Sequence, residues 1–69
     1  MRLSARNQLW GTVTAIEHGR VMSSVKVTLP GGQVITAAIT REAAEELGLA
    51  PGDSVVAIVK ATEVMLGRQ

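Results

Sequence analysis

The chain has to fold without a disulfide, because none of its 69 residues is cysteine. A domain this short buries only about 60% of the surface that its unfolded chain exposes, so its own core provides little stability. The lack of cysteine also excludes a thiolate zinc site as a source of stability. Self-association is the remaining common solution. We therefore expect a single domain, residues 1–69, that works as a homo-oligomer.

Alternating apolar and polar residues predict a mainly β fold. The clearest strand is residues 22–29, in which Val25, Val27 and Leu29 would share one face. Four further segments have the character of strands: residues 8–16, 33–39, 54–60 and 62–66.

The first of these segments carries Leu9, Val13 and Ala15 on one face, and Gly11 interrupts it. A glycine inside a strand suggests a bulge or a close approach of another backbone.

One short helix is expected between the third and fourth strands. Thr40 can cap its start by accepting a backbone N–H, and Gly48 would end it. Pro30-Gly31-Gly32 is a strong turn signal between the second and third strands. Five short strands with one helix in this position predict a five-stranded barrel of the oligonucleotide-binding type.

The charge balance argues against nucleic acid as the partner. Seven Lys and Arg against six Asp and Glu give a net charge of only +1, whereas nucleic-acid binders usually carry a strong positive field. Trp10 is the only aromatic residue, and stacking platforms for single strands need several rings. Trp10 is better explained by packing or a subunit contact. A nucleic-acid-binding barrel remains the alternative, and a purely structural oligomer is a third possibility.

Neither a membrane nor an export route is indicated. No apolar run approaches the roughly 20 residues that span a bilayer. The first six residues carry two arginines with no apolar stretch behind them, so they do not form a secretory signal. We expect a cytoplasmic protein without a membrane partner.

Three segments are rich in hydrogen-bond donors that suit an oxyanion. Ser4, Ala5, Arg6 and Asn7 precede the first strand; Lys60, Ala61 and Thr62 lie near the other end of the chain; Thr40 stands at a helix start. Arg and Lys supply positive charge, while Ser, Thr, Asn and backbone N–H groups donate without needing a counter-charge. Each segment also has an ordinary explanation, namely a solvated loop, a solvated lysine and a simple helix cap. Their coincidence in one short chain favours an anion site.

Catalysis and direct metal coordination are not indicated. His18 is the only histidine, and without cysteine partners it is best explained as a turn residue. No residues have the spacing of a nucleophile with its base, and there is no phosphate-cradling glycine loop. We expect a binding protein and no enzyme.

The ends of the chain closely resemble the molbindins, the small molybdate-binding Mop proteins of the wider TOBE group. The resemblance rests on Ser4-Ala5-Arg6-Asn7-Gln8-Leu9 with Gly11, Val13 and Ile16, on Lys60-Ala61-Thr62-Glu63-Val64-Met65, and on Gly31-Gly32, Ile39-Thr40 and Leu47-Gly48-Leu49 between them. It covers nearly the whole chain.

The resemblance implies a hexamer, described as a trimer of dimers, that holds molybdate or tungstate between subunits for storage or homeostasis. It places Ser4, Arg6 and Lys60 around the anion and adds Thr40 from a neighbouring subunit. It also implies a second class of site on threefold axes, near His18, Gly19, Arg20 and Val21. One departure is Ala43, where the family often has serine. No organic cofactor is expected, because nothing suggests a concave, partly aromatic pterin pocket.

Overall fold

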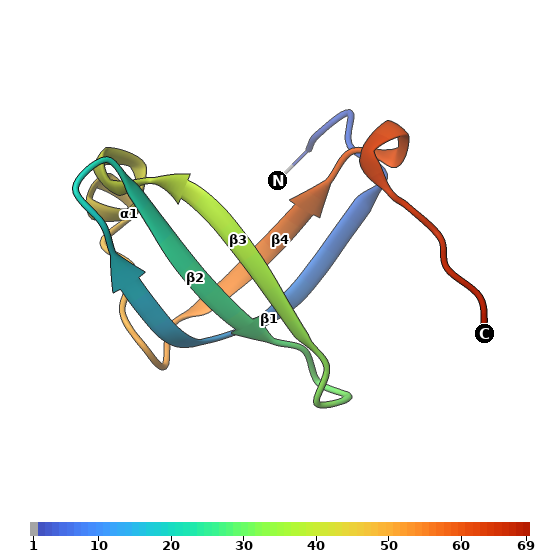
Figure 1. Ribbon diagram of the computed structural model, residues 1–69, viewed down its shortest axis with the longest axis horizontal. Coiled ribbons are helices and arrows are strands. Elements are labelled where there is room, and N and C mark those ends of the chain that lie inside the picture. Colours follow the sequence, from blue (N-terminus) through green and yellow to red (C-terminus); the bar gives the residue numbers. More distant parts are fainter. Residues whose placement is uncertain (1) are drawn as a thin grey trace.

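The computed structural model describes residues 2–69 and shows a curled antiparallel sheet with one short α-helix (Figure 1). The elements are β1 (Asn7–His18), β2 (Met22–Thr28), β3 (Val34–Thr40), α1 (Arg41–Leu47), β4 (Ser54–Val59) and the 3₁₀ helix η1 (Ala61–Glu63). The strands lie in the order β3-β2-β1-β4. The mainly β fold and the helix between the third and fourth strands were predicted correctly.

The predicted fifth strand, residues 62–66, is wrong. Among residues 2–69 the sheet has four strands, so it forms an open half-barrel and not a closed barrel. The chain instead enters η1 and then the C-terminal tail, residues 64–69, which runs away from the sheet (Figure 1). A strand needs a neighbour to satisfy its backbone groups, and this segment pairs with no strand among residues 2–69. Met65 and Leu66 are 91% and 95% exposed.

A bulge in β1 changes which side chains face inward. The register with β2 shifts between Val13 and Ala15, so the alternation of faces is offset by one residue. Val13 is buried, and the next inward residue is Ile16, which packs against the core while Ala15 is exposed. The prediction that Leu9, Val13 and Ala15 share a buried face is therefore wrong for Ala15, and Leu9 is also exposed.

Gly11 is a point of close backbone approach, as predicted. A Cβ atom added at this position would lie 2.7 Å from the Thr28 carbonyl oxygen and 2.8 Å from Val27 Cγ1. The bulge itself lies further along β1. Only glycine lets β1 and β2 come this close, which lets the sheet curl into a half-barrel.

The ends of α1 agree with the predicted caps. Thr40 has extended backbone angles, and its Oγ1 accepts a hydrogen bond from the Ala43 backbone N–H at 3.1 Å. Gly48 adopts a left-handed conformation with φ of 63° and donates its N–H to carbonyls of the last helical turn. The helix thus occupies the short connection from β3 toward β4.

The hydrophobic core is small. Val13, Val25 and Val27 form its buried cluster, and a ring of partly buried residues packs against them: Ile16, Leu29, Ala37, Ile39, Leu49 and Val55. Many larger apolar side chains stay exposed, including Trp10, which is 59% exposed and so does not pack in the core of its own chain. A core of this size agrees with the expectation that the domain needs a partner for stability.

Among residues 2–69, no helix is both long enough and apolar enough to cross a membrane.

Candidate anion-binding site

Antiparallel pairing of β1 with β4 brings two donor-rich segments to the same end of the sheet. Asn7, the first residue of β1, lies opposite Val59, the last residue of β4. Residues 4–6 and residues 60–62 therefore lie at the same end of the sheet, and Figure 1 shows the N-terminal segment beside η1. The structure thus joins Ser4, Ala5, Arg6 and Asn7 with Lys60, Ala61 and Thr62, which are 53 or more residues away in sequence.

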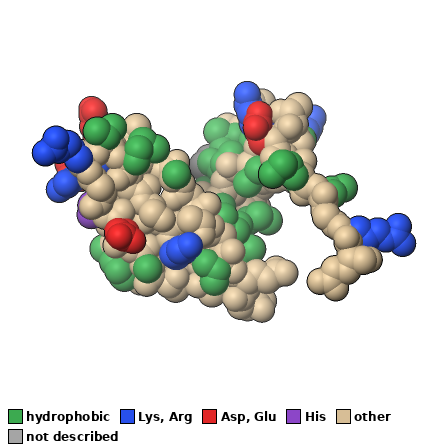
Figure 2. Space-filling model, viewed as in Figure 1, with side chains coloured by type: hydrophobic (Ala, Val, Ile, Leu, Met, Phe, Trp, Pro, Cys, Tyr) green, Lys and Arg blue, Asp and Glu red, His purple; other side chains and the backbone are tan. Residues whose placement is uncertain are grey.

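The joined cluster is positively charged. Neither segment contains a carboxylate, and the Arg6 and Lys60 side chains are exposed. Within residues 2–69 neither of these cations is engaged in an ion pair, since the one ion pair found there joins Arg41 to Glu45. Figure 2 shows Lys and Arg side chains at this end of the molecule with an acidic side chain beside them, and Glu63 directly follows Thr62 in η1. Two cations with neighbouring hydroxyl and backbone donors form a set that suits a small dianion.

Two side-chain amides hold the cluster in shape. Asn7 Nδ2 donates to the Val59 carbonyl at 3.1 Å, so this amide fastens the two segments together. Gln8 Nε2 donates to the Ala5 carbonyl at 3.2 Å and fixes the loop that carries Arg6. Gln8 was not among the predicted site residues, although it belongs to the string that resembles the molbindins. Its place directly after the polar pair Arg6-Asn7 was the available signal.

Thr40 lies at the opposite end of the sheet. It pairs with Met22 in the β2–β3 ladder, and Arg41, the next residue, donates its backbone N–H to the Val21 carbonyl at 2.8 Å. Arg6 and Thr40 are thus separated by the length of β1, as Figure 1 shows by the positions of α1 and the N-terminal segment. One chain does not bring Thr40 to the other two segments.

Two of the four residues of the second predicted site, Arg20 and Val21, line a groove of about 440 Å³ beside Thr40, and His18 and Gly19 are not among its lining residues. The lining residues of the groove are Arg20, Val21, Thr40, Arg41, Glu42 and Glu45. Arg41, which sequence reasoning did not select, donates to Glu45 at 2.8 Å and to the Gly19 carbonyl at 3.4 Å. Two arginines and two carboxylates thus line the groove, and carboxylates oppose the binding of a dianion.

His18 ends β1 and does not lie in the turn itself. Its Nδ1 is 2.7 Å from Ser23 Oγ, and Ser23 is buried with an exposed fraction of 2%. The histidine therefore satisfies a buried hydroxyl of β2. Within residues 2–69 no group of three or more histidine, cysteine or acidic side chains is arranged to hold a metal ion.

Replacing Thr40 with alanine is expected to lower the free energy of unfolding by about 1 kcal/mol, because the Ala43 N–H loses its capping acceptor. Urea denaturation followed by circular dichroism measures this change. Thr40→Ser is the control, since it keeps the hydroxyl and should retain most of the stability. Equal losses in both variants would contradict the capping role.

Comparison with known proteins identifies the family to which this chain belongs. Residues 3–66 match the model of the TOBE domain. The chain belongs to the TOBE domain family. A probable molybdenum-pterin-binding protein of Haemophilus influenzae is 45% identical over 67 residues, which are 97% of each chain. The structure of a molybdate-binding protein from Sporomusa ovata aligns with a TM-score of 0.93 and 41% identity, covering 99% of this chain and 100% of that one.

These relatives confirm the resemblance to the Mop proteins, and both are named as binding proteins, which supports the prediction that this TOBE domain is not an enzyme. A third relative is a longer protein. The molybdenum transport protein ModE of Herbaspirillum seropedicae is 49% identical over 67 residues, which are 97% of this chain and 25% of ModE. The domain therefore spans about a quarter of that protein's length.

Proposed function

We propose that this TOBE domain binds molybdate or tungstate at the interfaces of a homo-oligomer, for storage or homeostasis of the oxyanion in the cytoplasm. The observation that carries the proposal is the position of Ser4–Asn7 and Lys60–Thr62 at the same end of the sheet, which gathers two cations and several neutral donors without a carboxylate in either segment. The names of the Haemophilus and Sporomusa relatives support molybdenum as the element that is bound.

The bound species would be the intact dianion, surrounded by N–H and O–H donors and not coordinated by protein atoms. Arg6 and Lys60 would balance its charge, and charge-assisted hydrogen bonds contribute about twice as much as neutral ones. Ser4 and Thr62 would add hydroxyl donors. Sulfate has the same charge and shape but shorter bonds, so discrimination against it would depend on the size of the cavity.

The proposed assembly is a hexamer arranged as a trimer of dimers, in which Thr40 of one subunit completes the anion site of another. Thr40 suits this role chemically, because its oxygen accepts the capping bond from Ala43 while its hydroxyl proton stays available to donate. The small core and the many exposed apolar side chains support self-association. Residues 18–21, from the last residue of β1 through the turn that follows it, would form the second class of site only when several copies meet.

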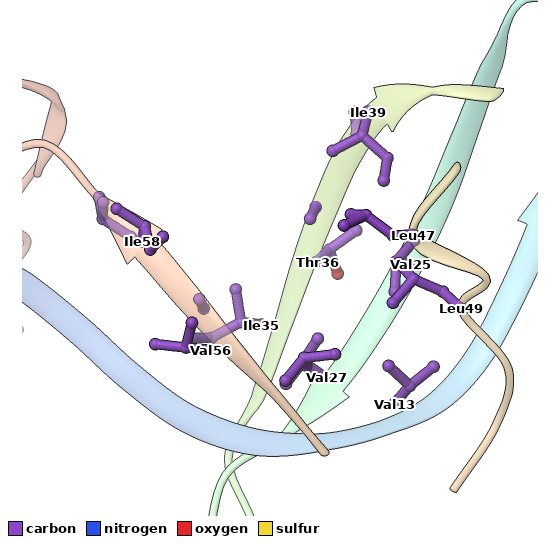
Figure 3. A pocket seen from close by; sticks show the side chains of 15 residues that line it. Val13, Val25, Val27, Ile35, Thr36, Ile39, Leu47, Leu49, Val56 and Ile58 are labelled. Carbon is purple, nitrogen blue, oxygen red and sulfur yellow. The ribbon is translucent and has the colours of Figure 1, made fainter. Parts of the chain in front are cut away.

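No organic cofactor is part of the proposal, although relatives carry a pterin in their names. Apart from Thr36, the cavity of about 480 Å³ that β3 and β4 border is lined by aliphatic side chains (Figure 3). A pterin site would need several convergent polar groups. The bare oxyanion is therefore the proposed ligand.

Molybdate at 100 times its dissociation constant is expected to stabilise the protein by about 2.7 kcal/mol, because the anion binds the folded form only. For a domain of this size that gain raises the melting temperature by roughly 10 °C or more. Thermal denaturation followed by circular dichroism measures it. Sulfate at the same concentration is the control for ionic strength and should produce a much smaller shift. An unchanged melting temperature in saturating molybdate would refute the proposed function.

A further inference from the structure

A single acidic residue, Glu63, stands beside the proposed anion site, the Arg6 cluster, which comprises Ser4–Asn7 and Lys60–Thr62. Of the six acidic residues of the chain, Glu63 alone lies before β1 or after β4. It belongs to η1 and directly follows Thr62, and its side chain is exposed. Figure 2 shows an acidic side chain beside the Lys and Arg side chains at this end of the molecule. The site proposed for a dianion therefore has a carboxylate as its neighbour.

The turn of η1 holds Glu63 near Lys60. The Glu63 backbone N–H donates to the Lys60 carbonyl at 2.9 Å, and this bond closes a single 3₁₀ turn that keeps the two residues close together. The next backbone bond joins the Val64 N–H to the Ala61 carbonyl at 3.4 Å. Position 63 contributes only its backbone to these bonds, so a different side chain there leaves the turn in place.

Glu63 does not neutralise the cations of the cluster. Among residues 2–69 the one ion pair joins Arg41 to Glu45, so neither Arg6 nor Lys60 has a carboxylate within ion-pair distance. A carboxylate that orients a site cation would pair with it. An unpaired carboxylate acts on a bound anion through its charge, and like charges repel each other.

We propose that Glu63 is a specificity-determining residue of the anion site, because its carboxylate repels the bound dianion and lowers the affinity. This inference rests on the proposed function, since it concerns the same site. Coulomb repulsion is proportional to the charge of the ligand, so Glu63 selects against anions of higher charge. Affinity differences between related complexes lie mostly in the dissociation rate. The repulsion therefore speeds release, which suits a protein that stores an oxyanion and must give it up again.

A charge series at position 63 tests this inference by calorimetric titration with molybdate in about 0.1 M salt. Glu63→Gln removes the charge and should raise the affinity about three- to tenfold. Glu63→Lys reverses the charge and should raise the affinity by about the square of that factor, because the charge changes by two units. Glu63→Asp keeps the charge and should stay within about twofold of the natural protein.

Asp53→Asn is the matched control. It also removes one negative charge, and asparagine keeps a carbonyl oxygen to accept the Ala50 N–H, which Asp53 Oδ2 accepts at 2.9 Å. Asp53 precedes the first residue of β4 and Lys60 follows the last, so roughly 20 Å separates them. This distance exceeds the Debye length of about 10 Å at 0.1 M salt. The control should therefore change the affinity less than about twofold.

High salt gives a second readout, which a purely structural effect would not change. At about 1 M salt the Debye length falls to about 3 Å, so the gain of Glu63→Gln over the natural protein should shrink below about twofold. A gain that persists undiminished would overturn the inference.

The direction of the effect separates repulsion from the alternative roles. Unchanged or weaker molybdate binding in Glu63→Gln, the result expected if the carboxylate oriented Lys60, would overturn the inference but leave the proposed function intact. An equal gain in Asp53→Asn would also overturn it, because net charge alone would then explain the effect. If the natural protein and every variant bound no molybdate, the proposed function itself would be refuted.

Discussion

Arg6→Ala is expected to lower the affinity for molybdate by about 10- to 100-fold, and Lys60→Ala by a similar factor. Each variant removes a charged donor from a site that holds a dianion, and one charge-assisted hydrogen bond contributes about 1.5–3 kcal/mol. Both side chains are free of ion pairs within the described residues, so their loss leaves no carboxylate of the protein unpaired. Isothermal titration calorimetry of each purified variant measures the change.

Lys26→Ala is the matched control for these two variants. It removes one positive charge from the exposed face of β2, where Lys26 donates to Thr36 at 2.7 Å, outside the Arg6 cluster. Its molybdate affinity should stay within about threefold of the natural protein, because exposed charges more than a Debye length apart are screened by salt. If all three variants lost affinity equally, the net charge of the protein would explain binding better than a built site.

Gly11→Ala is expected to destabilise the protein by about 2 kcal/mol and to lower the melting temperature by roughly 8–16 °C. The added Cβ would lie 2.7 Å from the Thr28 carbonyl oxygen, and this backbone atom cannot move without disturbing the β1–β2 pairing. Thermal denaturation measures the loss.

Gly31→Ala separates the clash at Gly11 from the general effect of replacing glycine. A Cβ at Gly31 meets nothing within 4 Å, and this glycine does not have a positive φ. Its substitution should therefore change the stability by no more than about 0.5 kcal/mol. An equal loss at both positions would show that the close approach at Gly11 does not determine the stability of the sheet.

The local signals in the sequence predicted most of the fold. The alternation in residues 22–29 is uninterrupted, and Val25 and Val27 are buried as expected. Thr40 and Gly48 cap α1 because their side-chain and backbone properties act within one helical turn. The bulge between Val13 and Ala15 was not predictable by alternation, because it depends on how β1 pairs with β2 and not on the residues of β1 alone.

The last segment was mispredicted for a different reason. Residues 62–66 contain apolar side chains that suit a strand, but a strand also needs an edge to pair with, and the 3₁₀ turn at Ala61–Glu63 leads the chain away from its own free edges. Residue types alone do not reveal whether such an edge is available to the segment.

The candidate site was predictable in its chemistry and only partly in its geometry. The polar residues before β1 and after β4 were selected for their donors, and the pairing of Asn7 with Val59 joins them. Thr40 has the right donor as well, yet one chain holds it at the far end of the sheet, beside Val21. Its distance from the cluster follows from the order of the strands, which donor chemistry does not determine.

The most direct test of the proposed function is a calorimetric titration of the purified protein with molybdate, repeated in excess sulfate, with the number of anions bound per chain recorded. The proposed site requires saturable molybdate binding that excess sulfate does not displace, with an affinity that falls in Arg6→Ala and Lys60→Ala. An absence of binding heat, supported by no retention of molybdate in equilibrium dialysis, would contradict the proposal that this TOBE domain is an oxyanion-binding protein.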